Sequence, residues 1–143
     1  MNRASSDLPF GSEFSPSQIE LAVLLELVKE HEGDGRALEK AILKRYFSLH
    51  AKGRKGTEAD YNRGKLANNC KLGLIAYGVI DRNVKLTSFG KSLYEFRRSS
   101  AKLFEALARH ILLNLNGMAM VQCIQDMTVA GEEVNLTTLR DGL

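Results

Sequence analysis

Apolar side chains recur at helical spacing along most of this chain, and the pattern predicts a mainly helical protein. Ser15 suits the cap of a first helix, whose apolar stripe runs from Ile19 to Val28. Asp34 is placed to cap a second helix, in which apolar residues recur at steps of about four from Leu38 to Phe47. Residues 1–14 lack this pattern, so they are expected to be an irregular segment or the remnant of a cloning linker.

A third helix is predicted over about residues 58–75, and it is followed by a pattern typical of strands. Residues 77–80 and 84–86 suit two short strands, and the polar residues 81–83 suit the turn between them. The sequence therefore predicts a small β-hairpin that rests on a helical platform. The residues predicted to form the core are Ile19, Val23, Leu27, Leu38, Ile42, Phe47, Leu66, Cys70, Leu74, Val79 and Leu86.

Two more helices complete this part of the chain and lead to a possible second unit. Thr87 or Ser88 can cap a fourth helix, and a fifth is predicted over about residues 100–115, where Gly117 breaks the pattern. Residues 117–143 then repeat the apolar pattern of the first two helices. The predicted organisation is an irregular segment (1–14), a domain (15–99), a connecting helix (100–116) and the start of a second unit (117–143). A unit of two helices suggests either a fragment of a longer protein or a core that is completed by oligomerisation.

Length and composition limit the class of protein. The chain has 143 residues, 44% of them hydrophobic and 26% charged, which is enough apolar surface for a folded domain. Two cysteines, Cys70 and Cys123, exclude a disulfide framework and a four-cysteine zinc site, and both are expected to be small packed side chains. The longest uncharged run, Ile111 to Gln125, contains two asparagines and a glycine and is too short to span a bilayer. A cytoplasmic protein is expected.

Charge is strongly segregated along the chain, although the formal net charge is only +3. Residues 36–71 carry ten basic and three acidic side chains, a net charge of +7, whereas residues 1–35 carry two basic and seven acidic ones, a net charge of −5. The basic segment coincides with the predicted loop before the third helix and with that helix itself. This distribution indicates a surface that faces an anion, although a solvated lysine-rich face would give the same count.

Three helices followed by a two-stranded hairpin and another helix resemble the winged helix-turn-helix DNA-binding domains. The stretch Leu86-Thr-Ser-Phe-Gly-Lys-Ser-Leu-Tyr94 is similar to the Leu-Thr-x-x-Gly-x-x-Leu segment that often follows the wing. The resemblance covers about residues 16–99, and residues 117–143 resemble the first two helices of a second such domain. Tandem winged helices of this kind resemble the recognition portions of restriction enzymes and other bacterial defence proteins, and of some transcription regulators.

This resemblance implies that the third helix enters the major groove of double-stranded DNA and that the wing touches the backbone or the neighbouring groove. Asparagine amides can read adenine, and arginine or lysine can meet guanine or phosphate. The candidate base contacts are Asn62, Arg63, Lys65, Asn68 and Asn69. The candidate backbone contacts are Lys52, Arg54, Lys55, Thr57, Tyr61, Lys71, Arg82 and Lys85. Arg97 and Arg98 end a helix, where a structural role is at least as plausible.

The sequence contains no recognisable catalytic motif. It lacks an Asp/Glu-x-Lys pair, a His-Glu-x-x-His segment, a phosphate-binding Gly-x-x-x-x-Gly-Lys loop and a Gly-x-Ser-x-Gly elbow. No enzymatic activity, metal or cofactor is therefore expected of this chain, although a longer protein containing it could be a nuclease.

Two alternatives share the predicted fold. One is a dimeric transcription regulator, which would bind palindromic sites about one helical turn apart. The other is a protein-interaction domain without DNA affinity, in which the first and fifth helices form an apolar dimer surface. The apolar run from Ile111 to Val121 favours the second alternative.

Overall fold

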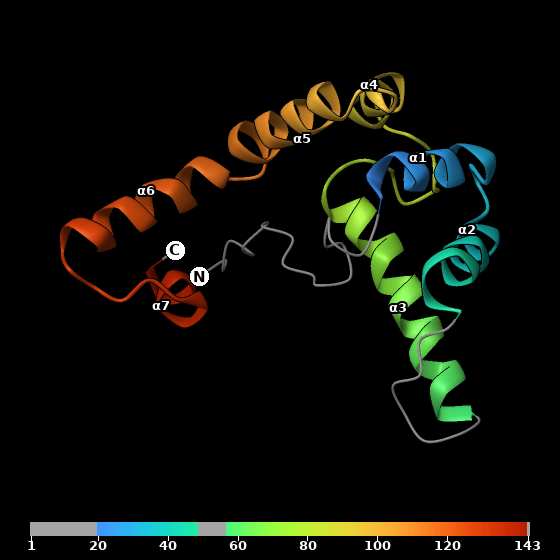
Figure 1. The fold of residues 1–143 in the computed structure, drawn as a ribbon, viewed down its shortest axis with the longest axis horizontal. Coiled ribbons are helices and arrows are strands. Elements are labelled where there is room, and N and C mark those ends of the chain that lie inside the picture. Colours follow the sequence, from blue (N-terminus) through green and yellow to red (C-terminus); the bar gives the residue numbers. More distant parts are fainter. Residues whose placement is uncertain (1–19, 49–56, 143) are drawn as a thin grey trace. The chain divides into compact units, whose positions relative to one another are not determined.

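The computed structural model describes residues 20–48 and 57–142, and these residues are mainly helical (Figure 1). Helix α1 is followed by a second helix that ends in a π-helical turn, η2, and α3 is the longest helix in the described part. The elements are α1 (Leu21–Glu30), α2 (Gly35–Ile42), η2 (Leu43–Phe47), α3 (Thr57–Ala76), α4 (Ser88–Phe96), α5 (Ser100–Asn114), α6 (Gly117–Val129) and α7 (Leu136–Gly142).

Most predicted helices are confirmed to within a few residues, and so are two of the predicted caps. The Asp34 carboxylate accepts a hydrogen bond from the Ala37 amide at 3.0 Å and caps α2. The Thr87 hydroxyl accepts one from the Gly90 amide, also at 3.0 Å, and caps α4. The start of the first helix at Ser15 lies outside the described residues.

The predicted β-hairpin is wrong, and with it the winged-helix fold. Residues 20–48 and 57–142 contain no strand, and residues 77–86 form a compact turn with one isolated antiparallel bridge between Ile80 and Leu86. The physical reason lies in the backbone partners. Two amides do donate across the turn, from Asp81 to the Lys85 carbonyl and from Thr87 to the Val79 carbonyl, but the pairing extends no further. The amides of Val79 and Ile80 donate instead to the Leu74 carbonyl at the end of α3, and the Leu86 amide donates to the Glu32 carboxylate.

The tip of this turn is also fixed by bonds other than strand pairing. The Asp81 carboxylate accepts hydrogen bonds from the amides of Asn83 and Lys85, as aspartate often does in turns. Val84 is buried with a positive φ of 60°, a conformation that a β-branched residue rarely adopts and that no regular strand contains. The alternating apolar residues of this segment therefore pack from a turn into the core, and they do not line one face of a sheet.

The main core lies among α1, α2, α3 and α4. Leu38, Ile42, Phe47, Cys70, Leu74, Val79 and Leu86 are buried as predicted. In α1 the buried residues are Leu21, Leu24, Leu25 and Val28, whereas the predicted Val23 and Leu27 are only half-buried. Leu66 is also half-buried, because its neighbour Ala67 takes the inward position. The prediction for Ile19 lies outside the described residues.

The Leu-Thr-x-x-Gly-x-x-Leu segment has a structural role at each named position. Leu86 and Leu93 are buried, and Thr87 caps α4 while donating to the Gly78 carbonyl. Gly90 packs against the backbone of the turn, since an added Cβ there would lie 1.9 Å from the Val79 carbonyl oxygen. The segment therefore packs α4 against the 77–86 turn, and it does so although this turn contains no strand.

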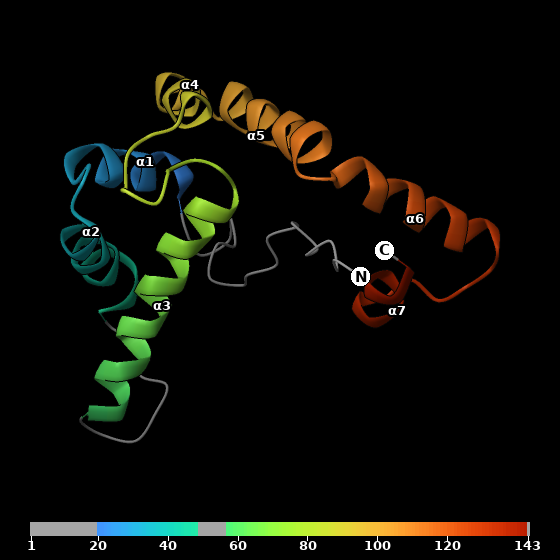
Figure 2. The same cartoon turned by 180° about the vertical axis from the view of Figure 1, so that it is seen from behind.

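The described chain divides into two compact units, and the boundary falls inside α5, between Phe104 and Glu105. In the second unit α6 packs against α7, and a loop joins the two helices (Figure 2). Gly131 in this loop has a positive φ of 72°. Gly117 and Met127 are the buried residues among those of 105–142 whose burial is described. Cys123 is half-buried, 3.9 Å from the Met127 sulfur, so the prediction of a packed side chain holds less well for it than for Cys70.

In the same described ranges, no helix combines the length and the apolar character that crossing a membrane requires.

Candidate nucleic-acid interface

Helix α3 has a packed face and an outward face, and the candidate chemistry lies on the outward one. Ala67, Cys70 and Leu74 are buried against the core. At about 100° per residue, the opposite side of the helix carries Tyr61, Lys65, Asn68 and Leu72. Tyr61 is 70% exposed and Leu72 is 49% exposed, Lys65 is also exposed, and Asn68 is half-buried. We call these four residues the outward stripe of α3.

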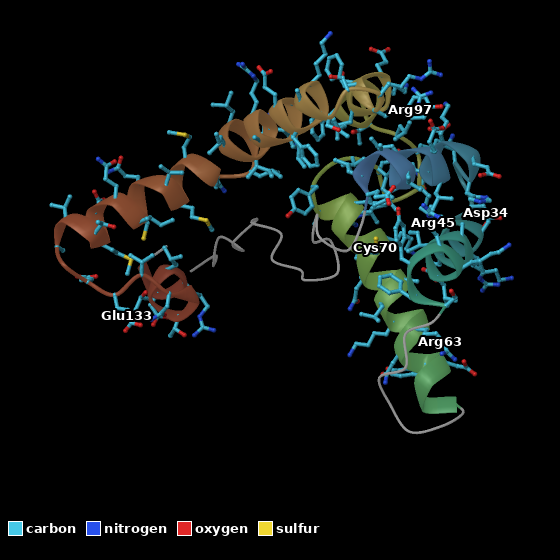
Figure 3. The ribbon with its side chains drawn as sticks, viewed as in Figure 1. Asp34, Arg45, Arg63, Cys70, Arg97 and Glu133 are labelled. Carbon is cyan, nitrogen blue, oxygen red and sulfur yellow. The ribbon has the colours of Figure 1, made fainter. Side chains whose placement is uncertain are left out.

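Two predicted contacts are instead held in ion pairs. Arg63 lies on the packed side of α3 and pairs with Asp60, and its side chain is only 23% exposed. Lys71 pairs with Glu39 of α2, and its side chain is 18% exposed. Figure 3 shows Arg63 on the lower half of α3, with Cys70 higher on the same helix. Neither cation is in the outward stripe, and Lys71 acts as a link between α2 and α3.

A second set of cations, which the sequence analysis did not assign to the site, lies on α2 and η2. They are exposed and spaced four residues apart, and we call them the α2 cations: Arg36, Lys40 and Lys44. Among the described residues, none of the three forms an ion pair. The spacing of four on a predicted helix was readable in the sequence, because side chains four apart share a helical face.

The Glu39–Lys71 ion pair indicates that the outward stripe of α3 and the α2 cations lie on the same side of the α2–α3 pair. Helices α2 and α3 lie side by side in both ribbon views (Figures 1 and 2). Three residues back along each helix, a side chain lies about 60° further from the packed face. From Lys71 this leads to Asn68, and from Glu39 it leads to Arg36. The outward stripe and the α2 cations therefore flank the same ion pair.

The 77–86 turn lies close to the beginning of α2, which brings two more predicted contacts into this region. The Gly33 amide donates to the Val84 carbonyl at 3.0 Å, and an added Cβ on Gly35 would lie 3.4 Å from the Val84 side chain. Arg82 and Lys85 are exposed on this turn. Hydrogen bonding by Lys29 and by the Leu86 amide lowers the pKa of Glu32, so this carboxylate is charged at neutral pH while it holds the turn.

The remaining predicted contacts divide into two groups. Asn62 and Asn69 are half-buried at the edges of the outward stripe and already interact with other groups. Lys52, Arg54 and Lys55 lie outside the described residues, and the side chain of Thr57 is not described either. Of the predicted contacts, the structure thus places Tyr61, Lys65 and Asn68 on the outward stripe of α3. Arg82 and Lys85 are exposed on the 77–86 turn, which is hydrogen-bonded to the end of α3 and next to the start of α2.

The basic residues near α4 have a different role. The Arg97 guanidinium pairs with Glu26 of α1 and lies 3.8 Å from the centre of the Tyr94 ring. The hydrogen bond from Arg97 lowers the pKa of Glu26. Arg97 thus links α4 to α1, which is a structural role. Arg98 is exposed.

Elsewhere the described residues offer less for binding an anion. Within them, no group of three or more His, Cys, Asp or Glu side chains is arranged to hold a metal ion. A cleft of about 580 Å³ between α6 and α7 is lined partly by Gln122, Asp126 and Glu132. Its two carboxylates disfavour a polyanion.

Comparison of the chain with protein-family models, with curated proteins and with solved structures finds no match. The geometry of this surface is therefore the basis for assigning a function.

Proposed function

We propose that this chain binds double-stranded DNA, with the outward stripe of α3 in the major groove and the α2 cations on the phosphate backbone. The observation that carries the proposal is the Glu39–Lys71 ion pair, because it sets Asn68 and Arg36 on the same side of the α2–α3 pair. Specific DNA binding needs contacts to base edges and contacts to phosphates. The outward stripe of α3 can supply the first, and the cations beside it can supply the second. A cytoplasmic location, expected from the sequence, agrees with this proposal.

The dimensions of α3 support the proposal. The helix has 20 residues, so it is about 30 Å long, and B-DNA's major groove is about 12 Å wide and admits one helix. Lys65, which is exposed, and Asn68, which is half-buried, follow each other on the outward stripe, and their donors suit the guanine and adenine edges of the groove. Tyr61 near the beginning of the helix offers a hydroxyl to a phosphate.

A salt titration of binding to duplex DNA tests the proposal. Fluorescence anisotropy with a random-sequence duplex should show binding at about 50 mM salt that weakens steeply toward 200 mM, because neutralising phosphates releases counterions. The same titration with single-stranded DNA of equal length is the control and should show weaker binding. Absence of duplex binding at low salt contradicts the proposal.

A second candidate function is self-association through α5. Phe104, Leu112 and Leu113 are exposed on this helix, the last at 66%. Light scattering as a function of concentration separates the two candidates. A dimer without DNA affinity favours self-association alone, and a dimer that also binds duplex DNA favours a dimeric regulator.

A further inference from the structure

Leu72 is the aliphatic side chain of the outward stripe, and its position suggests a specific use. It is 49% exposed, and it follows Asn68 by four residues, so the two side chains are neighbours on the outward stripe. A single exposed leucine needs no explanation by itself. Here, however, it stands directly beside Asn68, the asparagine of the outward stripe.

The major-groove edge of an A·T pair presents both features that such a pair of side chains would meet. Adenine offers N7 and the N6 amino group, which an asparagine amide can bind with two hydrogen bonds, and thymine adds a C5-methyl group, which favours apolar contact. A G·C pair has no methyl group at this edge. A leucine there would bury its methyl groups against polar atoms without gain.

The spacing of the two residues fits neighbouring base pairs. One helical turn separates Asn68 from Leu72, which is about 5.4 Å along the axis, and stacked base pairs are about 3.4 Å apart. Two side chains one turn apart therefore reach the same base pair or the next pair or two when the helix lies along the groove.

We infer that Leu72 is a specificity-determining residue that contacts thymine C5-methyl groups, and that the DNA target of this chain has A·T pairs where Asn68 and Leu72 meet the groove. This inference rests on the proposed function. It assigns Asn68 to adenine and Leu72 to thymine at adjacent positions of the same site.

The test removes the methyl group and nothing else. Duplexes that the full chain selects from a random pool are remade with deoxyuridine in place of thymidine at each position in turn, and affinity is measured by anisotropy. We expect about a fourfold loss at one or two positions, the effect of losing one buried methyl-sized group. Leu72→Ala should bind the thymine and uracil duplexes equally, and Val129→Ala, which truncates an exposed aliphatic side chain of α6, should keep the wild-type difference.

Asn68 is tested with a matched change on the adenine. Replacing adenine by 7-deazaadenine at the neighbouring positions removes the N7 acceptor, and it should weaken the wild-type protein but not Asn68→Ala. Circular dichroism of both variants checks that α3 remains folded.

The possible outcomes separate this inference from the proposed function. Salt-dependent duplex binding that is indifferent to the thymine methyl, or a selected pool of G·C pairs alone, overturns the role of Leu72 and leaves DNA binding intact. No duplex binding by the full chain overturns both. Loss of the methyl effect in Leu72→Ala but not in Val129→Ala supports the inference.

Discussion

At the scale of single residues, two glycines in helices have opposite structural roles. Gly64 in α3 has open space where a Cβ would be added, within 4 Å of it. Gly90 in α4 has the Val79 carbonyl oxygen in that place. Sequence propensity treats both alike, because glycine in the middle of a helix costs about 0.5–1 kcal/mol relative to alanine.

We predict that Gly64→Ala and Gly90→Ala change stability in opposite directions. Gly64→Ala should raise the free energy of unfolding by about 0.5–1 kcal/mol, because alanine is the better helix former and meets no neighbour. Gly90→Ala should lower it by about 3 kcal/mol, because the turn must move away from α4. Urea unfolding followed by circular dichroism measures both. Equal effects of the two substitutions would contradict the close approach at Gly90.

The Glu32 carboxylate gives a prediction about pH. Its pKa is lowered in the folded protein from an ordinary value of 4.5, chiefly by the hydrogen bond from Lys29 and then by the one from the Leu86 amide. A group with a depressed folded pKa stabilises the protein above its unfolded pKa, and this contribution is lost as pH falls through the folded pKa.

We therefore expect Glu32→Gln to be less stable than the wild type at neutral pH, with the difference shrinking as pH is lowered below about 4.5. Glutamine can still accept from the Leu86 amide, so the substitution removes the charge and keeps the shape. Urea midpoints at several pH values from 7 to 3 measure the difference. A constant difference across this range would show that the Glu32 charge does not support the turn.

At the scale of helices, the α2 surface is the part of the site that sequence reasoning left out. The exposed cations Arg36 and Lys40 lie on the same side of the α2–α3 pair as the outward stripe, next to the Glu39–Lys71 ion pair. Phosphate contacts of this kind hold a protein on DNA without choosing a sequence.

We predict that the double variant Arg36→Gln/Lys40→Gln binds all duplexes more weakly and lowers the slope of log affinity against log salt by about two. The matched control is Arg98→Gln/Lys102→Gln, which removes two exposed charges from the end of α4 and the start of α5. Both proteins have the same net charge, so a loss in the first variant alone places the contact on α2. Equal losses would mean that only net charge matters.

At the scale of the whole molecule, the two units differ in how much apolar surface they bury. Leu24, Leu38, Leu74 and Leu93 are fully buried in the first unit. In the second, Met127 is the buried large side chain among those described, and Met118, Val121 and Val129 are exposed. Local stability follows buried apolar contacts.

Native-state hydrogen exchange should therefore show amides of α6 and α7 exchanging well before those of α1, α2 and the buried half of α3. We expect differences of at least about a hundredfold in protection, which corresponds to roughly 3 kcal/mol of opening free energy. The measurement uses the full chain at neutral pH. Equal protection in both units would show that the second unit is stabilised by contacts other than its own core.

The sequence predicted more about the helices than about the surface they present. Asp34 and Thr87 were identified as caps because capping depends on residues three or fewer positions away. In α1, however, Leu24 and Leu25 took the buried positions in place of Val23 and Leu27, because a helix that is apolar almost all round shows no single inward face. Lys71 and Arg63 looked like available cations, and only their partners showed that they are engaged.

The sequence by itself determined the number and order of the described helices, their approximate ends, and the concentration of positive charge in residues 36–71, since each depends on neighbours along the chain. The tertiary structure decided that residues 77–86 form a turn with one bridge, because the amides of Val79 and Ile80 bind the end of α3 and the Leu86 amide binds the Glu32 carboxylate, 54 residues away. It also decided which cations remain exposed, because an ion pair such as Glu39–Lys71 joins residues 32 positions apart and leaves no pattern in the sequence.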